Sequence, residues 1–235
     1  NVTGVQTCAL PILRIILYCS ILNACNTAST NKDIQSKSYN NSRKIVVKIL
    51  PLGKVPLDYL QFVQLNLQKD FSEVQILPKA ELPKFAFVGL RKRYDAQKML
   101  AHLQDIYKKQ KFSERTFLVG VTEKDLCQNR QNAKLWKGKK GFGVPDYGIM
   151  GLGYQPKGEH IDASLKVNIN STKRLRRNTK EQLLKLIKHE IGHNCGLPHC
   201  DNKQCIMRDA EGGNHFDEMN GFCKRCKLKF AVLDN

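Results

Sequence analysis

The chain has 235 residues, of which 41% are hydrophobic and 26% charged, so it can form one substantial folded domain with a core. This composition is typical of soluble globular proteins. The formal net charge of +18 invites comparison with nucleic-acid-binding proteins, but the basic residues are scattered, with short clusters at residues 173–177 and 224–227. Because no nucleic-acid-binding motif accompanies them, we expect a solvated basic surface and no specific nucleic-acid partner, with another anionic partner as the alternative.

Residues 1–25 are predicted to be a non-native start followed by a targeting segment. The chain does not begin with methionine, and residues 1–12 resemble read-through of a sequencing adapter. Arg14, the apolar run 15–22 and a small residue before Cys25 resemble a bacterial lipoprotein signal, in which Cys25 is the acylated residue. The run is too short for a transmembrane helix. This resemblance implies a lipoprotein of the bacterial cell envelope, attached to the membrane through Cys25; a cytoplasmic protein is the alternative.

Residues 26–43 are predicted to be a flexible tether, because almost all of them are polar. The folded domain is expected to span residues 44–235, where strands and helices alternate. Runs rich in β-branched residues predict strands, and apolar residues at helical spacing predict helices. We expect strands at 44–50, 73–78, 116–122, 147–154 and 160–168, and helices at 58–71 and 94–109. This order favours an α/β fold with a twisted, mixed but mostly parallel sheet flanked by helices.

Two stretches between these elements have distinctive compositions. Residues 124–140 are polar and irregular, which predicts a surface loop holding Cys127 and Trp136. The stretch 147–154 is glycine-rich, which in a strand indicates a bulge or the close approach of another part of the backbone.

The stretch HEIGHNCGLPHC, residues 189–200, is preceded by a predicted helix. Asn178 or Thr179 is expected to cap that helix, with Glu181 or Gln182 completing a capping box. His189 and His193 are four residues apart, so their rings project from the same helix face at the spacing that two imidazoles need to bind one zinc ion.

Glu190 is offset by about 100° around the helix, beside the metal, where a carboxylate can take a proton from a zinc-bound water. Gly196 can adopt positive φ and end the helix, and the chain then returns to His199. Three protein ligands and one water make a catalytic zinc site, whereas structural sites are closed by four ligands. The alternative is a polar helix end without metal.

The pattern HExxHxxGxxH resembles that of the metzincin metallopeptidases. In that family a methionine after the third ligand forms a turn beneath the zinc, and Met207 occupies this position here. The adjacent cysteine after His199, the following C-x-M and the distant CxxC are similar to the archaemetzincins specifically. This resemblance implies a metzincin-like zincin fold and a zinc-dependent peptidase that acts on peptides or proteins as a monomer, with Glu190 as general base. It also implies that an extended substrate lies along an edge strand, for which 147–154 is the candidate.

Four cysteines close to this motif form two pairs, Cys200 with Cys205 and Cys223 with Cys226. Their spacing predicts a structural zinc site with four thiolate ligands, as the resemblance also implies, which brings the expected number of zinc ions to two. Disulfides or free thiols are the alternatives. Because neighbouring residues on extended backbone point in opposite directions, His199 is expected to face one metal and Cys200 the other.

The remaining cysteines and histidines of the domain receive no metal in this interpretation. Cys195 is expected to be a small buried hydrophobe, and Cys127 has no assigned role. His102, His160 and His215 are expected at the surface, because no partner spacing supports ligation. A non-catalytic zinc-binding module that captures peptides or anionic partners is the runner-up function.

Overall fold

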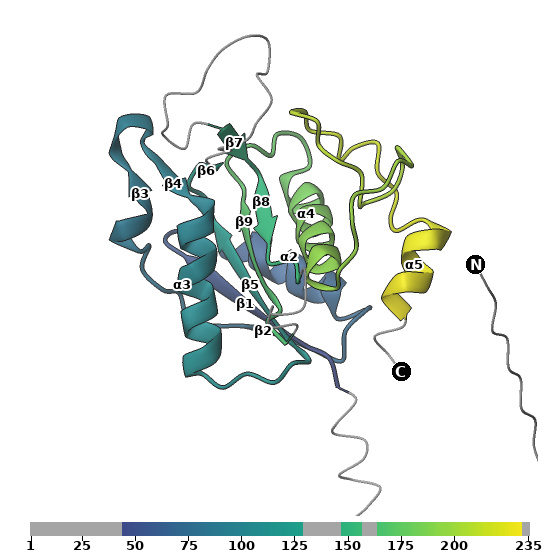
Figure 1. The fold of residues 1–235 in the computed structure, drawn as a ribbon, viewed down its shortest axis with the longest axis horizontal. Coiled ribbons are helices and arrows are strands. Elements are labelled where there is room, and N and C mark those ends of the chain that lie inside the picture. The colour runs from purple at the N-terminus through teal and green to yellow at the C-terminus, as the bar shows by residue number, and fades with distance from the viewer. Residues whose placement is uncertain (1–43, 129–146, 157–163, 232–235) are drawn as a thin grey trace, which may run out of the picture. The chain divides into compact units, whose positions relative to one another are not determined.

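A five-stranded sheet forms the centre of the computed structural model, which describes residues 44–128, 147–156 and 164–231 (Figure 1). Its strand order is β2-β1-β5-β9-β8. The first four strands are parallel and β8 runs antiparallel to β9, so the expectation of a mixed, mostly parallel sheet is confirmed. The strands are β1 (Val46–Leu52), β2 (Glu73–Ile76), β5 (Thr116–Thr122), β8 (Gly151–Gly153) and β9 (Val167–Ser171).

Helices cover both faces of this sheet. One face packs against α2 (Leu57–Leu67) and α4 (Thr179–Asn194), and the other against α3 (Ala96–Lys109). Alternation along β5 explains the two cores, because Val119 packs on the α4 side and Leu118 on the α3 side. Figure 1 shows α5 (Lys224–Ala231) beyond α4, next to the loops of the C-terminal segment. Among the described residues, no helix has both the length and the apolar character that crossing a bilayer requires.

A second, four-stranded sheet has the order β3-β4-β6-β7. Its strands are β3 (Phe87–Val88), β4 (Arg93–Asp95), β6 (Leu126–Gln128) and β7 (Tyr147–Ile149), and the short 3₁₀ helices η1 (Lys84–Ala86) and η2 (Gly89–Arg91) flank β3. The prediction of a surface loop over 124–140 is wrong for Leu126–Gln128, because these residues form β6, which pairs with both β4 and β7. Residues 129–140 lie outside the described residues. Cys127 is fully buried there.

The predicted strand 147–154 is two strands. β7 pairs with β6 in the second sheet, whereas β8 pairs with β9 in the first, so the chain changes sheets at Met150. Of the predicted strand 160–168, residues 160–163 lie outside the described residues and 164–166 are not in a strand. β9 begins at Val167 and continues to Ser171, and all five of its residues are buried. The helix predicted over 94–109 begins at Ala96, since the Asp95 carboxylate accepts the backbone N–H groups of Gln97 and Lys98.

The predicted capping box of α4 does not form. Asn178 adopts the left-handed conformation (φ 46°, ψ 47°) and makes no capping bond through its side chain. The Gln182 side chain instead donates to the Asp217 carboxylate at 2.9 Å and accepts from the Asn214 amide. The side chain that was expected to cap the helix therefore bonds to a loop of the C-terminal segment.

The targeting segment 1–25 with Cys25, the tether 26–43, Trp136 and His160 lie outside the described residues, and the predictions about them stay predictions.

Candidate metal centres

The C-terminal half of α4 and the chain that follows it bring His189, His193 and His199 together. Their ring centroids lie 4.6 to 5.5 Å apart. One ring nitrogen from each histidine falls within a group whose atoms are all within 4.8 Å of one another. The predicted three-histidine cluster is thus present in the fold.

The end of α4 explains how His199 returns to the helix. Gly196 has φ +78°, as predicted, and the backbone N–H groups of Gly196 and Leu197 donate to the carbonyl oxygens of His193 and Gly192. This pair of bonds is the Schellman arrangement that ends many helices. The reversal directs the chain through Pro198 to His199.

The outer nitrogen of each imidazole has a partner. Nδ1 of His189 donates to the carbonyl oxygen of Ile206 at 2.6 Å, and Nδ1 of His193 donates to that of Leu197 at 2.8 Å. Nδ1 of His199 lies 3.2 Å from the Asp209 carboxylate. A carbonyl oxygen can only accept, so Nδ1 carries the proton in the first two rings, and their Nε2 atoms hold lone pairs when the rings are neutral.

These two Nε2 atoms lie 3.0 Å apart, and this distance can be compared with the separation of two nitrogen ligands on one metal ion. Two facing lone pairs repel each other unless a cation or an extra proton lies between them. Zinc–nitrogen bonds of about 2.0–2.1 Å in a tetrahedral arrangement place ligand nitrogens about 3.3 Å apart, close to the separation seen here. Burial, together with the neighbouring His193, lowers the pKa of His189 to about 3, which favours the neutral, metal-binding form. The residues therefore fit a zinc ion.

Glu190 lies beside these histidines with its side chain enclosed. It is 5% exposed, and burial raises its pKa to about 8, an effect that the backbone N–H of Gly153 partly opposes. A Cβ atom on Gly151 would lie 2.6 Å from Oε1 of Glu190, and one on Gly153 would lie 3.1 Å from Oε2. A Cβ atom on Gly153 would also lie 2.8 Å from the backbone carbonyl oxygen of Glu190. The predicted close approach of backbone is therefore confirmed at Gly153, whereas Gly151 is approached by the Glu190 side chain.

Met207 is fully buried and packs against Gly192 of α4. A Cβ atom on Gly192 would overlap its sulfur, so the helix needs glycine where the methionine packs. The carbonyl oxygen of Met207 also accepts the backbone N–H of Cys200 at 2.8 Å. The predicted turn is thus tied both to the helix and to the segment that carries the third histidine.

A buried network of asparagines supports the same helix from the sheet. The Asn194 amide donates to the carbonyl oxygens of Tyr154 and Val167, and its own oxygen accepts from Asn168 at 2.8 Å. Asn170 continues the network by donating to Asn168 at 2.7 Å. All three asparagines are fully buried. The network was not predicted; the alternation of asparagine with valine and isoleucine in β9 is its signal in the sequence.

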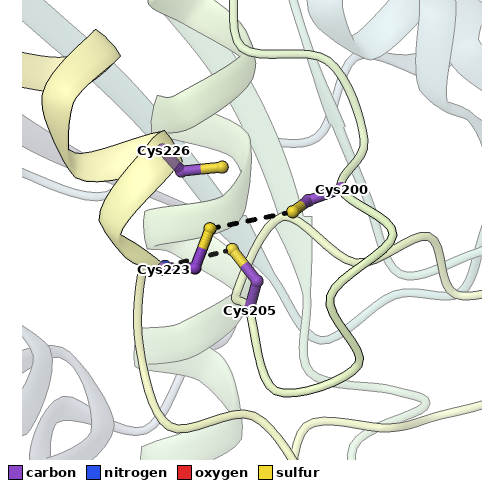
Figure 2. Close-up of side chains that lie close together, drawn as sticks. All are labelled: Cys200, Cys205, Cys223 and Cys226. Carbon is purple, nitrogen blue, oxygen red and sulfur yellow. Dashed lines mark hydrogen bonds between the residues drawn. The ribbon is translucent and has the colours of Figure 1, made fainter.

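The four predicted cysteines form a second cluster (Figure 2). Figure 2 shows the sulfurs of Cys223 and Cys226, from the start of α5, pointing toward those of Cys200 and Cys205 on the loop segment. The Sγ atoms of Cys200 and Cys223 lie 3.8 Å apart, too far for a disulfide, and all four cysteines are unpaired. Zinc–sulfur bonds of about 2.3 Å in a tetrahedron place sulfurs about 3.8 Å apart, so this cluster also fits zinc.

The surroundings of the cluster favour a thiolate at Cys223. The pKa of Cys223 is lowered to about 7, mainly because the backbone N–H of Cys226 donates to its sulfur. The guanidinium of Arg225 lies 3.3 Å from the sulfur of Cys200. Burial raises the pKa of Cys205 and Cys226, so these two thiols need a cation to ionise.

His199 and Cys200 face different clusters, as predicted. The His199 ring is 47% exposed and belongs to the histidine group, whereas Cys200 is buried in the cysteine group. Adjacent residues therefore connect the two candidate centres.

Comparison with known proteins decides the family. The sequence profile of Peptidase family M54 matches residues 57–231. The chain belongs to peptidase family M54. It is 29% identical over 191 residues to the archaemetzincin of Pyrococcus furiosus, covering 78% of this chain and 91% of that one. It is 27% identical to the archaemetzincin of Methanocaldococcus jannaschii over 187 residues, 77% and 90% of the two chains.

Solved structures show the same fold as this M54 chain. The archaemetzincin from Methanopyrus kandleri matches with a TM-score of 0.61 at 22% identity, covering 82% of this chain and 97% of that one. The zinc-dependent peptidase from Methanocorpusculum labreanum matches with a TM-score of 0.60 at 22% identity, covering 78% and 98%. The resemblance to archaemetzincins found in the sequence is confirmed.

The histidines of this M54 chain open onto a cleft with a volume of about 1200 Å³. Strands β7 and β8 and residues 208–217 contribute to its lining. Within the five-stranded sheet, β8 is one of the two edge strands. The expectation that part of 147–154 forms an edge beside the histidines is thus confirmed for Gly151–Gly153.

Some of the remaining expectations for single residues agree with the structure and others do not. Cys195 is partly buried against the core, and burial raises the pKa of its thiol to about 12. His102 stacks edge-on against Phe85, away from the cleft. His215 lines the cleft and lies 3.2 Å from the Glu218 carboxylate, so it is closer to the candidate site than expected. Asp209, the partner of His199, was missed, because a contact ten residues along the chain leaves no spacing signal.

Proposed function

We propose that this chain is a zinc-dependent peptidase in which His189, His193 and His199 bind the catalytic zinc. The observation that carries the proposal is the orientation of the imidazoles. Partners elsewhere in the chain hold Nδ1 of each ring, so in the neutral rings the Nε2 lone pairs of His189 and His193 converge at 3.0 Å. Membership of a peptidase family supports the same reaction class.

Glu190 is the proposed general base. Its carboxylate lines the same cleft as the histidines, next to Gly153, which also borders His193. When bound, zinc supplies Lewis acidity toward a water molecule and toward the scissile carbonyl. In its ionised form, the carboxylate of Glu190 would accept a proton from the attacking water and deliver it to the leaving amine.

The proposed substrate is a peptide or an extended protein segment. Strand β8 lies at the edge of the sheet and lines the cleft, so a substrate backbone can pair with it by strand addition. This pairing would place a peptide bond opposite Glu190, whose side chain packs against Gly151 and Gly153.

The proposed second zinc is structural and is bound by Cys200, Cys205, Cys223 and Cys226. Four thiolates leave no position for water or substrate. The ion would hold the start of α5 against the segment that connects His199 to Met207. It would thereby stiffen the support of the catalytic ligands.

Replacing Glu190 by Gln tests the catalytic role. Loss of a general base is expected to lower kcat/KM for peptide cleavage by about 10²- to 10⁴-fold, while zinc content is unchanged. Glu181→Gln, an exposed position on the same helix, is the matched control. Equal cleavage by Glu190→Gln and the parent would reject the general base, and a parent that binds peptides without cleaving any would favour the non-catalytic module.

Attachment to a membrane through Cys25 is a separate proposal, supported by the arrangement of residues 14–25. It predicts that intact-mass measurement of the membrane-associated protein finds a lipid adduct that Cys25→Ser abolishes. A protein of unmodified mass would reject it.

A further inference from the structure

The stretch KRLRRNTK, residues 173–180, contains five cations and no acid. Two of the five have partners: the Arg174 guanidinium binds the Asp125 carboxylate at 2.8 and 3.2 Å, and Lys180 lies 2.8 Å from the Asp58 carboxylate. Arg176 and Arg177 are exposed, and within the described part of the chain neither has an acidic partner. These two guanidinium groups are therefore available to an external anion.

Arg176 and Arg177 line the cleft that contains the three histidines. Lys173 is also exposed but does not line that cleft. Its substitution therefore shows the effect of removing a nearby positive charge that lies outside the cleft. The cleft thus has two free cations close to the start of α4 and the candidate metal ligands at its end.

Three carboxylates of residues 208–217 line the same cleft, and within the described part of the chain none of them forms an ion pair with Arg176 or Arg177. Asp209 lies against His199, and Asp217 accepts a hydrogen bond from the neutral Gln182 amide. Glu211 is exposed. The two guanidinium groups are therefore not paired with these acids of the cleft.

The helix sets the distance from the arginines to the histidines. Arg177 precedes α4, and His189 follows the first helical residue, Thr179, by ten positions. At 1.5 Å per residue, this separation is about 15–20 Å. An extended peptide advances about 3.3 Å per residue, so the arginines reach substrate residues about four to six positions from the cleaved bond.

The direction of β7 and β8 determines whether the arginines contact substrate residues on the N-terminal or the C-terminal side of the cleaved bond. Going along β7 and β8, Gly148 packs against the Arg174 guanidinium, whereas Gly151 and Gly153 pack against Glu190. A substrate that pairs antiparallel with β8, the slightly more stable arrangement, runs from Glu190 toward Arg174. Its residues C-terminal to the cleaved bond then lie at the arginine end of the cleft.

We propose that Arg176 and Arg177 bind a carboxylate of the peptide about four to six residues C-terminal to the cleaved bond. The carboxylate is either an acidic side chain or the C-terminus of a short peptide. The position relative to the cleaved bond rests on the proposed function, but the carboxylate preference is a property of binding and does not.

The test measures peptide binding to zinc-loaded, full-length Glu190→Gln by fluorescence anisotropy. The probes are extended peptides in which one Glu replaces Gln at successive positions, each with a free or an amidated C-terminus. An exposed ion pair is worth little individually, so two arginines should give a preference of about three- to tenfold for Glu at the matching position. The free C-terminus should give the same preference when it falls at that position.

Arg176→Gln combined with Arg177→Gln should abolish this preference and leave the binding of the all-Gln, amidated peptide unchanged. Lys173→Gln should retain the preference, and unchanged thermal unfolding confirms that the variants are folded. The proposal is overturned if the preference for Glu survives the double substitution or is absent in the parent. It is also overturned if Lys173→Gln lowers the preference as much as the double substitution does. A single-stranded oligonucleotide that binds through the same arginines more tightly than any peptide also overturns it, in favour of a nucleic-acid partner.

Cleavage by the parent chain separates this inference from the proposed function. If no peptide is cleaved but the preference is found, the function fails and the carboxylate site stands. If peptides are cleaved, mass spectrometry of the products identifies the bond, and a preference on its N-terminal side overturns the proposed direction.

Discussion

At the scale of single residues, the candidate site depends on partners that hold the imidazoles. His189 and His193 each donate from Nδ1 to a backbone carbonyl, whereas His199 relies on a side chain, Asp209. His199 is also the most exposed of the three candidate ligands, with 47% of its side chain accessible. The third ligand should therefore be the one most sensitive to loss of its partner.

Asp209→Ala is expected to weaken zinc binding at the histidines by about 10- to 100-fold, because the His199 ring loses the carboxylate that orients it. Competition with a chelator measures the affinity. The cysteine-bound zinc should be unaffected. Glu211→Gln, an exposed carboxylate two residues further on, is the control, and an equal loss with this variant would refute the orienting role.

Gly151→Ala tests the close packing around Glu190. The added Cβ would lie 2.6 Å from Oε1 of Glu190, so the carboxylate must move. We expect kcat/KM to fall at least about tenfold with zinc content unchanged, since small misplacement of a catalytic group is costly. Gly89→Ala, where no atom lies within 4 Å of the added Cβ, should behave as the parent. Full activity of Gly151→Ala would show that catalysis does not depend on the position of the Glu190 carboxylate seen here.

At the scale of elements, α4 shows which features a sequence can predict. Its histidines lie one turn apart, and Gly196 follows at the end, so both were predictable from local spacing. The cap at its start was not, because Gln182 bonds to Asp217, 35 residues away. Contacts between distant segments replaced the local preference.

The strands divide in the same way. β5 is a continuous apolar run buried along its whole length, and its predicted bounds are confirmed. β6 is three residues in a polar stretch, and it is a strand because β4 and β7 pair with both of its edges. Short strands of this kind owe their existence to partners, which periodicity within one segment does not reveal.

Gly196→Ala should lower the free energy of unfolding by about 1–2 kcal/mol, because an L-residue is strained at φ +78°. The added Cβ meets no atom within 4 Å, so the loss comes from the backbone alone. Denaturant unfolding measures it, and Gly196→Asn should lose less, since asparagine tolerates this conformation better. An alanine variant as stable as the parent would contradict this account of the helix end.

At the scale of the whole molecule, the two candidate centres join different parts of the chain. Two of the histidines lie on α4 and the third follows it, whereas the cysteines connect α5 to the loop segment. Leu197 and Met207 share a small core with the cysteines. Ile206, Phe216 and Met219 pack into the main core, so loss of the cysteine-bound metal should loosen chiefly the contact between α5 and the loop segment.

Cys223→Ser should remove the cysteine-bound zinc and destabilise the fold by at least about 3 kcal/mol, because the binding free energy of a structural zinc contributes directly to folding. Denaturant unfolding and limited proteolysis of the C-terminal segment measure the effect. Cys195→Ser, outside the cluster, should keep the full zinc content. A Cys223→Ser chain with unchanged zinc content and stability would refute the structural site.

The most direct test of the account is zinc stoichiometry by mass spectrometry under non-denaturing conditions. We predict two zinc ions for the parent chain, and one each for His193→Ala and Cys223→Ser. His193→Ala should lose peptide cleavage entirely while remaining folded. A parent chain that binds no zinc, or a His193→Ala variant that retains two zinc ions, would contradict the central claim that the histidine cluster is a zinc site.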